Sequence, residues 1–221
     1  TFQNILGMFV VIGGVLMGGA LYAFGGWRAF MMLAVFFFLG TATTKMGYAK
    51  KAALGIAQEK GGRRGAKNAI ANCGMAALLA FVSAATPYTS LALLALVAAF
   101  ATAACDTVGS EIGQAYGRTP YLVTSFKRVP AGTDGAVSLE GTLAGIVAAG
   151  ILAMAALALG LVTAAGAVLV VAAAFFGSTL ESWMGATWER SKLIDNEAIN
   201  FANTLAGALF AIAIPSLLPS I

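Results

Sequence analysis

The first residues that could do chemistry stand where a long apolar run ends at Asp106, with Glu111 five positions further on. Gly109, Gly113 and Gly117 recur every four residues beside them, which makes a ridge of small residues if the segment is helical. A carboxylate beside such a ridge suits Mg²⁺, which takes one or two carboxylates and completes its shell with phosphate oxygens and water. We therefore predict Mg²⁺ as the cofactor and both carboxylates as catalytic metal ligands. A capped helix end with a packing ridge is the alternative.

A second stretch, residues 125–142, combines adjacent cations with glycines and hydroxyls. Lys127 and Arg128 could neutralise phosphate oxygens, and we predict them as catalytic residues. Gly132 would permit a tight turn that binds an anion. The same stretch supplies three further predicted contacts, which are Thr133 and Ser138 for phosphate and Asp134 for the metal ion. The alternative is an ordinary loop, which would not need so many special residues.

A third stretch is basic and glycine-rich, and it precedes an apolar run. Arg63 and Lys67 are four apart and would share a helix face, while the start of the following helix offers free N–H groups. We predict that Arg63, Arg64 and Lys67 bind phosphate. Asn72 would lie a turn inside the membrane, where an unpartnered amide is costly, so we expect it to orient a substrate head group. The alternative is a positive anchor that touches lipid head groups.

A fourth stretch opens the last apolar run with Asp195, which we predict as a metal ligand. Asn200 and Asn203 follow on one helix face. An amide stripe in a membrane helix should face the bundle interior or water, so we expect both side chains to hold a substrate head group. The alternative is a set of interhelical contacts, each worth about 0.6 kcal/mol.

Composition shows which elements must position these residues. The chain is 60% hydrophobic and 10% charged, with a mean hydropathy of +0.88. Soluble proteins average about 45–50% apolar and about 25% charged residues, so lipid is the expected surrounding of residues 1–221. We predict one all-α domain, a polytopic transmembrane bundle. Its seven expected spans are 4–24, 27–44, 69–85, 87–104, 139–159, 163–183 and 198–218.

The charges indicate orientation. All Lys and Arg residues except Arg28 fall in or beside the expected loops 45–68, 105–138 and 184–197. Positive loops face the cytoplasm, which places the N-terminus inside and the C-terminus outside. The excess of cations is therefore topological, and we expect no nucleic-acid partner. All nine carboxylates lie in or next to the same loops, although topology does not require it. A polar site on the cytoplasmic face is the simplest reason.

Five blocks of sequence resemble the TMEM19/DUF92 membrane family. They are GGRRGAKNAIANCG, DTVGSEIG, PAGTDGAVSLEGTLAG, FFGSTLESWMGATWE and NEAINFANTLAGAL. The resemblance implies a phytyl-phosphate kinase of tocopherol biosynthesis, because that family contains such enzymes in plants and cyanobacteria. The order of Asp106, Gly113, Gly117, Lys127-Arg128 and Gly132-Thr133 is also similar to CTP-using dolichol and phytol kinases.

We therefore expect a Mg²⁺-dependent kinase that transfers the γ-phosphoryl group of CTP, or of another nucleoside triphosphate, to a prenyl phosphate embedded in the membrane. Such a reaction needs charge neutralisation and alignment more than covalent chemistry. The expected partners are the nucleotide, prenyl or phytyl phosphate and membrane lipid, and a homo-oligomer is left open. The alternatives are a lipid-phosphate cytidylyltransferase, a transporter of a phosphorylated metabolite, and a structural protein.

Overall fold

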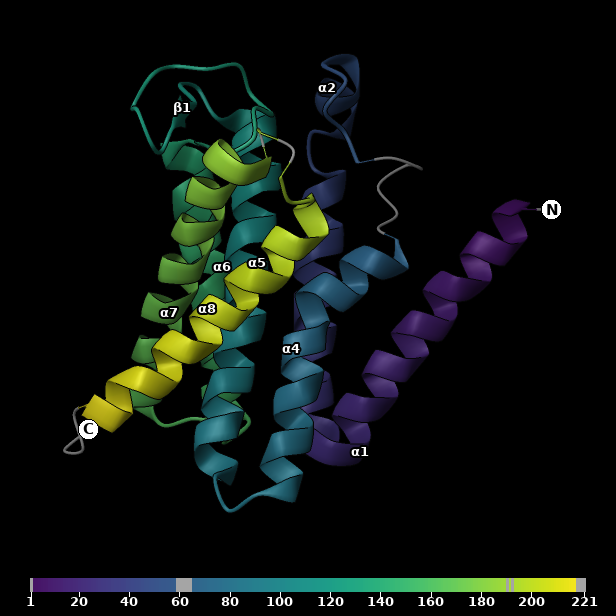
Figure 1. Ribbon diagram of the computed structural model, residues 1–221, viewed down its shortest axis with the longest axis vertical. Helices are drawn as coiled ribbons and strands as arrows, with labels where there is room; N and C mark the ends of the chain where they lie inside the picture. Colours follow the sequence, from purple (N-terminus) through teal and green to yellow (C-terminus); the bar gives the residue numbers. More distant parts are fainter. Residues whose placement is uncertain (1, 59–64, 190, 192, 218–221) are drawn as a thin grey trace.

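The first apolar stretch forms α1 (Phe2–Lys45), a helix of 44 residues that is broken at Gly26. At about 1.5 Å per residue it would measure about 66 Å, roughly twice the hydrocarbon thickness of a bilayer. The backbone of Gly26 is not helical, with φ 71° and ψ −177°. Figure 1 shows the two halves of α1 running in opposite directions on either side of this break. The helix labelled α1 therefore covers the first two predicted spans, one on each side of the break.

The computed structural model describes residues 2–58, 65–189, 191 and 193–217. The other helices in these ranges are α2 (Tyr48–Ala53), α4 (Ala66–Ala85), α5 (Thr89–Tyr116), α6 (Leu139–Ala158), α7 (Ala164–Met184) and α8 (Asn196–Leu217). A π-helical turn, η1 (Gly185–Glu189), continues α7. Within the described residues, six helices, with α1 taken as one, are long and apolar enough to cross a membrane. The predicted all-α, polytopic bundle of about seven spans is confirmed.

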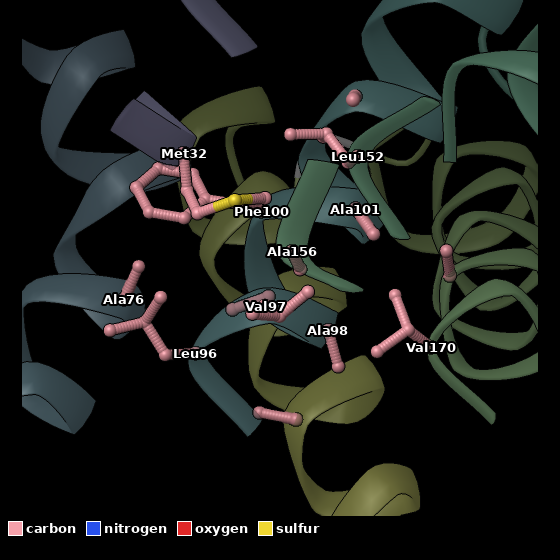
Figure 2. Close-up of a cluster of buried hydrophobic side chains, with 14 of the residues drawn as sticks. Met32, Ala76, Leu96, Val97, Ala98, Phe100, Ala101, Leu152, Ala156 and Val170 are labelled. Atoms are coloured by element: carbon pink, nitrogen blue, oxygen red, sulfur yellow. The ribbon is translucent and has the colours of Figure 1, made fainter. Parts of the chain in front are cut away.

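The core of the bundle is α5, which packs against α1, α4, α6, α7 and α8. Every residue of the range 95–108 is buried. Figure 2 shows Phe100 of this helix near Met32 of α1, with Leu152 of α6 and Val170 of α7 in the same cluster. Because many α5 side chains are alanines, neighbouring helices approach closely on all sides.

The predicted ridge of glycines on α5 meets α6 directly. A Cβ atom added to Gly141 would lie 2.5 Å from the carbonyl oxygen of Gly109, and one added to Gly145 would lie 2.5 Å from that of Cys105. The ridge therefore serves helix packing, which was the alternative interpretation. The same contact explains why α5 runs on to Tyr116 although the apolar span was expected to end at Ala104. Packing on α6 covers the polar turns of α5 that follow Ala104.

The expected loop 105–138 is more ordered than predicted, because its second half forms a small antiparallel cap. Strand β1 (Tyr121–Leu122) pairs with β2 (Ala136–Val137), and Tyr121 also bridges to Arg128. In Figure 1 this cap, α2, the end of α7 and the starts of α1 and α8 lie at one end of the bundle. The break in α1 and the end of α8 lie at the other end. The polar segments therefore gather on one face.

Candidate functional site

A cavity of about 290 Å³ lies beneath the β1–β2 cap. Its walls come from the last turns of α5, the first turn of α6 and the end of α7 with η1, and the cap forms its roof. These segments are far apart in the sequence, and the bundle brings them together because the loops share one face. The cavity is therefore the candidate functional site of this chain.

Four carboxylate residues line this cavity, and we call them the carboxylate cluster. They are Asp106, Asp134, Glu181 and Glu189. None of the described residues that line the cavity is a lysine or an arginine. The described lining therefore carries negatively charged groups that attract cations, since opposite charges interact strongly in a partly buried site.

Asp106 of α5 and Glu181 of α7 form the deepest part of the cluster. Asp106 is only 8% exposed, and the two carboxyl groups are within hydrogen-bond reach of each other. The Ser182 hydroxyl also donates to Glu181 Oε2 at 3.4 Å. Two carboxyl groups this close need a proton or a cation between them, because two adjacent negative charges cannot both persist uncompensated.

The π-helical turn η1 brings Glu189 to the same cavity. In a regular α-helix, a residue eight positions after Glu181 would be rotated by about 80° from it. A π-turn holds more residues per turn, which reduces this rotation. The Asn196 side chain at the start of α8 hydrogen-bonds to Glu189. Local π-helix is frequent at functional sites, and here it brings the carboxylate of Glu189 to the cavity.

The roof of the cavity is held by close backbone contacts. Gly135 of the cap has φ 72°, and a Cβ atom there would lie 2.3 Å from the Ala186 nitrogen and 2.4 Å from the Ser182 oxygen. On the other side, a Cβ atom on Gly132 would lie 2.6 Å from Cγ2 of Ile56, which follows α2. The cap is therefore fixed between the α2 segment and the end of α7.

Part of the predicted site comes together in this cavity. Asp106, Gly132, Thr133, Asp134 and Ser138 all line it. Two of these side chains also make local structural contacts. The Thr133 hydroxyl donates to Pro130 O at 2.8 Å, and the Ser138 oxygen accepts the Gly141 N–H at 3.2 Å as the N-cap of α6.

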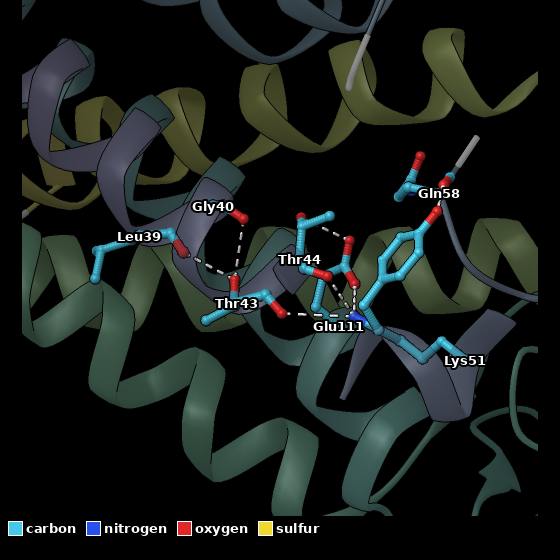
Figure 3. Close-up of polar contacts among 8 residues, drawn as sticks. Leu39, Gly40, Thr43, Thr44, Lys51, Gln58 and Glu111 are labelled. Atoms are coloured by element: carbon cyan, nitrogen blue, oxygen red, sulfur yellow. Dashed lines mark hydrogen bonds and ion pairs between the residues drawn. The ribbon is translucent and has the colours of Figure 1, made fainter. Parts of the chain in front are cut away.

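Glu111, predicted as a partner of Asp106, lies elsewhere. It is buried on another face of α5, where it pairs with Lys51 and accepts a hydrogen bond from Thr44 Oγ1 at 2.9 Å (Figure 3). The reason is helix geometry, because residues five apart point about 140° away from each other. Glu111 therefore joins α5 to α1 and α2 instead of reaching the cavity.

Other predicted residues also stand outside the cavity. Lys127 and Arg128 are exposed on the cap, and Lys67 is exposed in the first turn of α4. Asp195 accepts the Ala198 N–H at 2.9 Å and so caps α8. Arg63 and Arg64 lie outside the described residues. The cations were expected to surround the phosphates, but those that the structure describes do not line the cavity.

The predicted amides are buried, but they do not line the cavity either. Asn200 Nδ2 donates to Asn196 Oδ1 at 2.9 Å, and Asn72 Nδ2 donates to Asn68 O at 2.9 Å. Within the described part of the chain, Asn72 Oδ1 and both polar atoms of Asn203 have no hydrogen-bond partner. Their predicted contact with a head group stays a prediction.

The predicted site omitted Glu181 and Glu189, and the sequence analysis also missed Lys51, which pairs with Glu111 outside the cavity. Glu181 could have been found, because a carboxylate inside an apolar span is costly and marks a functional position. Glu189 depends on a π-turn for which the sequence carries no evident signal. Lys51 is 0% exposed, although by sequence it belongs with the exposed cations of a loop.

Comparisons with known proteins agree with the fold. Residues 3–208 match the family described as integral membrane protein DUF92. An uncharacterized membrane protein of Synechocystis is 41% identical over 201 residues, which cover 90% of this chain and 78% of that protein. Protein VTE6, chloroplastic, of Arabidopsis thaliana is 40% identical over 198 residues, covering 84% of this chain and 60% of that protein.

An uncharacterized membrane protein of Methanocaldococcus jannaschii is 32% identical over 210 residues, which cover 92% of this chain and 83% of that protein. No solved structure matches the chain. The match extends over nearly all the spans and includes every segment that lines the cavity. The chain therefore belongs to the DUF92 family of integral membrane proteins.

Proposed function

We propose that this chain is a Mg²⁺-dependent prenyl-phosphate kinase. It transfers the γ-phosphoryl group of a nucleoside triphosphate, preferably CTP, to a membrane-embedded prenyl monophosphate such as phytyl phosphate. The observation that carries the proposal is the carboxylate cluster, which lines a cavity at one end of a membrane bundle without a lysine or arginine among its described lining residues. A group of carboxylates in a cavity attracts divalent cations, and Mg²⁺ held by one or two carboxylates commonly binds substrate phosphates.

The residues of the cavity fit Mg²⁺. Their donors are carboxylate and hydroxyl oxygens, which are the ligands that a hard divalent cation prefers. Among the described residues, no three histidine, cysteine or acidic side chains lie close enough together to hold a metal ion. Mg²⁺ usually takes one or two carboxylates and completes its shell with phosphate oxygens and water. Asp106 with Glu181, and Asp134 with Glu189, would hold the metal, and the metal would neutralise the phosphate oxygens.

The α7 wall of the cavity is consistent with a lipid acceptor. Phe175 and Thr179 of α7 line the cavity, and both residues are exposed. In a bilayer, exposed apolar positions on a spanning helix face lipid. A prenyl tail could lie along α7 in the lipid while its phosphate enters the cavity.

The reaction forms a bond from an acceptor phosphate oxygen to the γ-phosphorus and breaks the bond to the β–γ bridging oxygen. The products are a prenyl diphosphate and the nucleoside diphosphate. The acceptor phosphate is already an anion, so no general base is required, which is consistent with a chain that has no histidine. The cavity residues supply alignment and charge, which are the main requirements of phosphoryl transfer.

Membership of the DUF92 family supports the kinase, because the sequence resemblance connects that family with phytyl-phosphate kinases. The preference for CTP depends on the weaker likeness to dolichol and phytol kinases. The positive-inside rule assigns the cavity to the cytoplasmic side, with the N-terminus inside and the C-terminus outside.

The test uses the purified chain in lipid nanodiscs with γ-labelled CTP, Mg²⁺ and phytyl phosphate. We expect label in a lipid diphosphate, with loss of transfer after chelation by EDTA and recovery on adding Mg²⁺. α-Labelled CTP run in parallel would label the lipid if the chain were a cytidylyltransferase. Absence of transfer from every nucleoside triphosphate to several prenyl phosphates would overturn the proposal.

A further inference from the structure

The β1–β2 cap carries an aromatic pair at the mouth of the carboxylate cavity. The rings of Tyr121 and Phe126 are stacked, with centroids 6.0 Å apart and an interplanar angle of 22°. Both residues line the carboxylate cavity, and both also line a second, more open hollow of about 200 Å³ with Thr119 and Arg128. The aromatic pair therefore stands between the two spaces.

Phe126 is held in an unfavourable position in two respects. It is the only non-glycine residue with a positive φ in the described part of the chain, at 54°, and its side chain is 76% exposed. A bulky residue in the left-handed region is uncommon, and an exposed aromatic ring at the tip of a cap gains little from burial. Strain of this kind is found where a structure needs a side chain in a particular place.

Backbone hydrogen bonds maintain this conformation. The Phe126 N–H donates to Leu122 O at 2.8 Å, and the Leu122 N–H donates to Lys127 O at 3.0 Å. These bonds close a tight turn in which the exposed ring of Phe126 lies beside Tyr121. The Phe126 ring is thus preorganised, so a flat ligand could bind to it without the entropic cost of ordering the turn.

We propose that Phe126 and Tyr121 form a stacking platform for the base of the donor nucleotide, a suggestion that rests on the proposed kinase function. An aromatic ring offers a π-face to any nucleobase, and such stacking is largely independent of base identity. With the base on this platform, the triphosphate extends into the carboxylate cavity. Arg128 lines the outer hollow, and its guanidinium group would add a cation beside the same ligand.

The test measures binding to the full chain in nanodiscs by calorimetry, with Mg²⁺ and two probes. One is a non-hydrolysable CTP analogue, and the other is inorganic tripolyphosphate, which has no base. Phe126→Ala should weaken binding of the analogue about tenfold and leave tripolyphosphate unchanged. Phe126→Trp should restore the affinity. Tyr88→Ala, which removes an exposed aromatic ring before α5 at the other end of the bundle, is the control and should change neither.

The results separate this inference from the kinase itself. Unchanged affinity of Phe126→Ala for the analogue, or an equal loss for both probes, would overturn the platform even if label reaches the prenyl phosphate. Selective loss of the analogue would support the platform even if no label is transferred, and in that case only the kinase fails. A wild-type chain that binds neither probe would overturn the platform, while the kinase is decided by the transfer assay with every nucleoside triphosphate.

Discussion

Lys51 of α2 and Glu111 of α5 form a buried ion pair that joins two segments sixty residues apart in the sequence. Lys51 Nζ also donates to Thr44 O at 3.0 Å, so this cation caps the end of α1. Lys50 Nζ donates to Ala115 O near the end of α5 at 2.5 Å. Two cations that a topology rule counts as loop charges are therefore used to hold helix ends together.

Breaking this pair should destabilise the chain. Glu111→Gln leaves Lys51 buried without a counter-charge, which typically costs about 3–5 kcal/mol. The free energy of unfolding, measured by denaturant titration in mixed micelles, should fall by this amount. The double variant Lys51→Met with Glu111→Leu should recover most of the loss, because a buried pair can be replaced by apolar residues at little cost. An unchanged stability of the single variant would contradict this role.

Removing the deepest carboxylate should abolish transfer without unfolding the protein. Asp106→Asn should lower kcat by on the order of 10²-fold or more, because a charged group that holds the metal and phosphates is lost. The apparent melting temperature should change little, since asparagine has nearly the shape of aspartate and keeps an oxygen that accepts hydrogen bonds. Asp195→Asn is the control, because asparagine caps a helix about as well as aspartate. Equal activity of the two variants would remove Asp106 from the site.

The attachment of the cap to α7 is tested at Gly135. An added Cβ atom would lie 2.3 Å from the Ala186 nitrogen, and the backbone φ is 72°. Gly55 has a similar φ of 71° but nothing within 4 Å of an added Cβ atom. Gly55→Ala should cost only the conformational strain, on the order of 1 kcal/mol. Gly135→Ala should cost more and should raise the KM for the nucleotide, and equal effects would show that the contact is unimportant.

The close approach of α5 and α6 gives a second pair of glycine variants. Gly141→Ala would force a methyl group against the Gly109 oxygen at 2.5 Å, whereas Gly150 of the same helix has nothing within 4 Å. We expect Gly141→Ala to destabilise the bundle by about 1–3 kcal/mol through overpacking. Gly150→Ala should be neutral or stabilising by up to about 1 kcal/mol, because alanine favours a helix. Thermal unfolding in detergent measures both.

Replacing Asn203 should raise the stability of the fold and weaken the activity. It is 0% exposed, and its side-chain atoms have no partner among the described residues. Asn203→Leu removes a buried unsatisfied amide, which should stabilise the fold by about 1–3 kcal/mol. If the amide orients the acceptor, the KM for the prenyl phosphate should rise in the same variant. A variant that is more stable and fully active would show that this amide has no part in binding.

The sequence by itself determined the spans and the face on which the polar residues gather. A run of about 20 apolar residues is a local property, and so is the Gly25-Gly26 break that divides α1. Asp106, Asp134 and the glycine-rich segment around Thr133 were also recognisable, because polar residues at the ends of apolar runs are conspicuous without any knowledge of their neighbours.

Only the tertiary structure decided which of these residues share a site. Asp106 and Glu111 lie on one helix, but the rotation between them directs one to the cavity and the other to Lys51. Glu181 and Glu189 join Asp106 because α7 packs on α5 and ends in a π-turn. Helix packing and turn geometry set these directions. They depend on contacts between distant segments, so no local pattern of residues contains them.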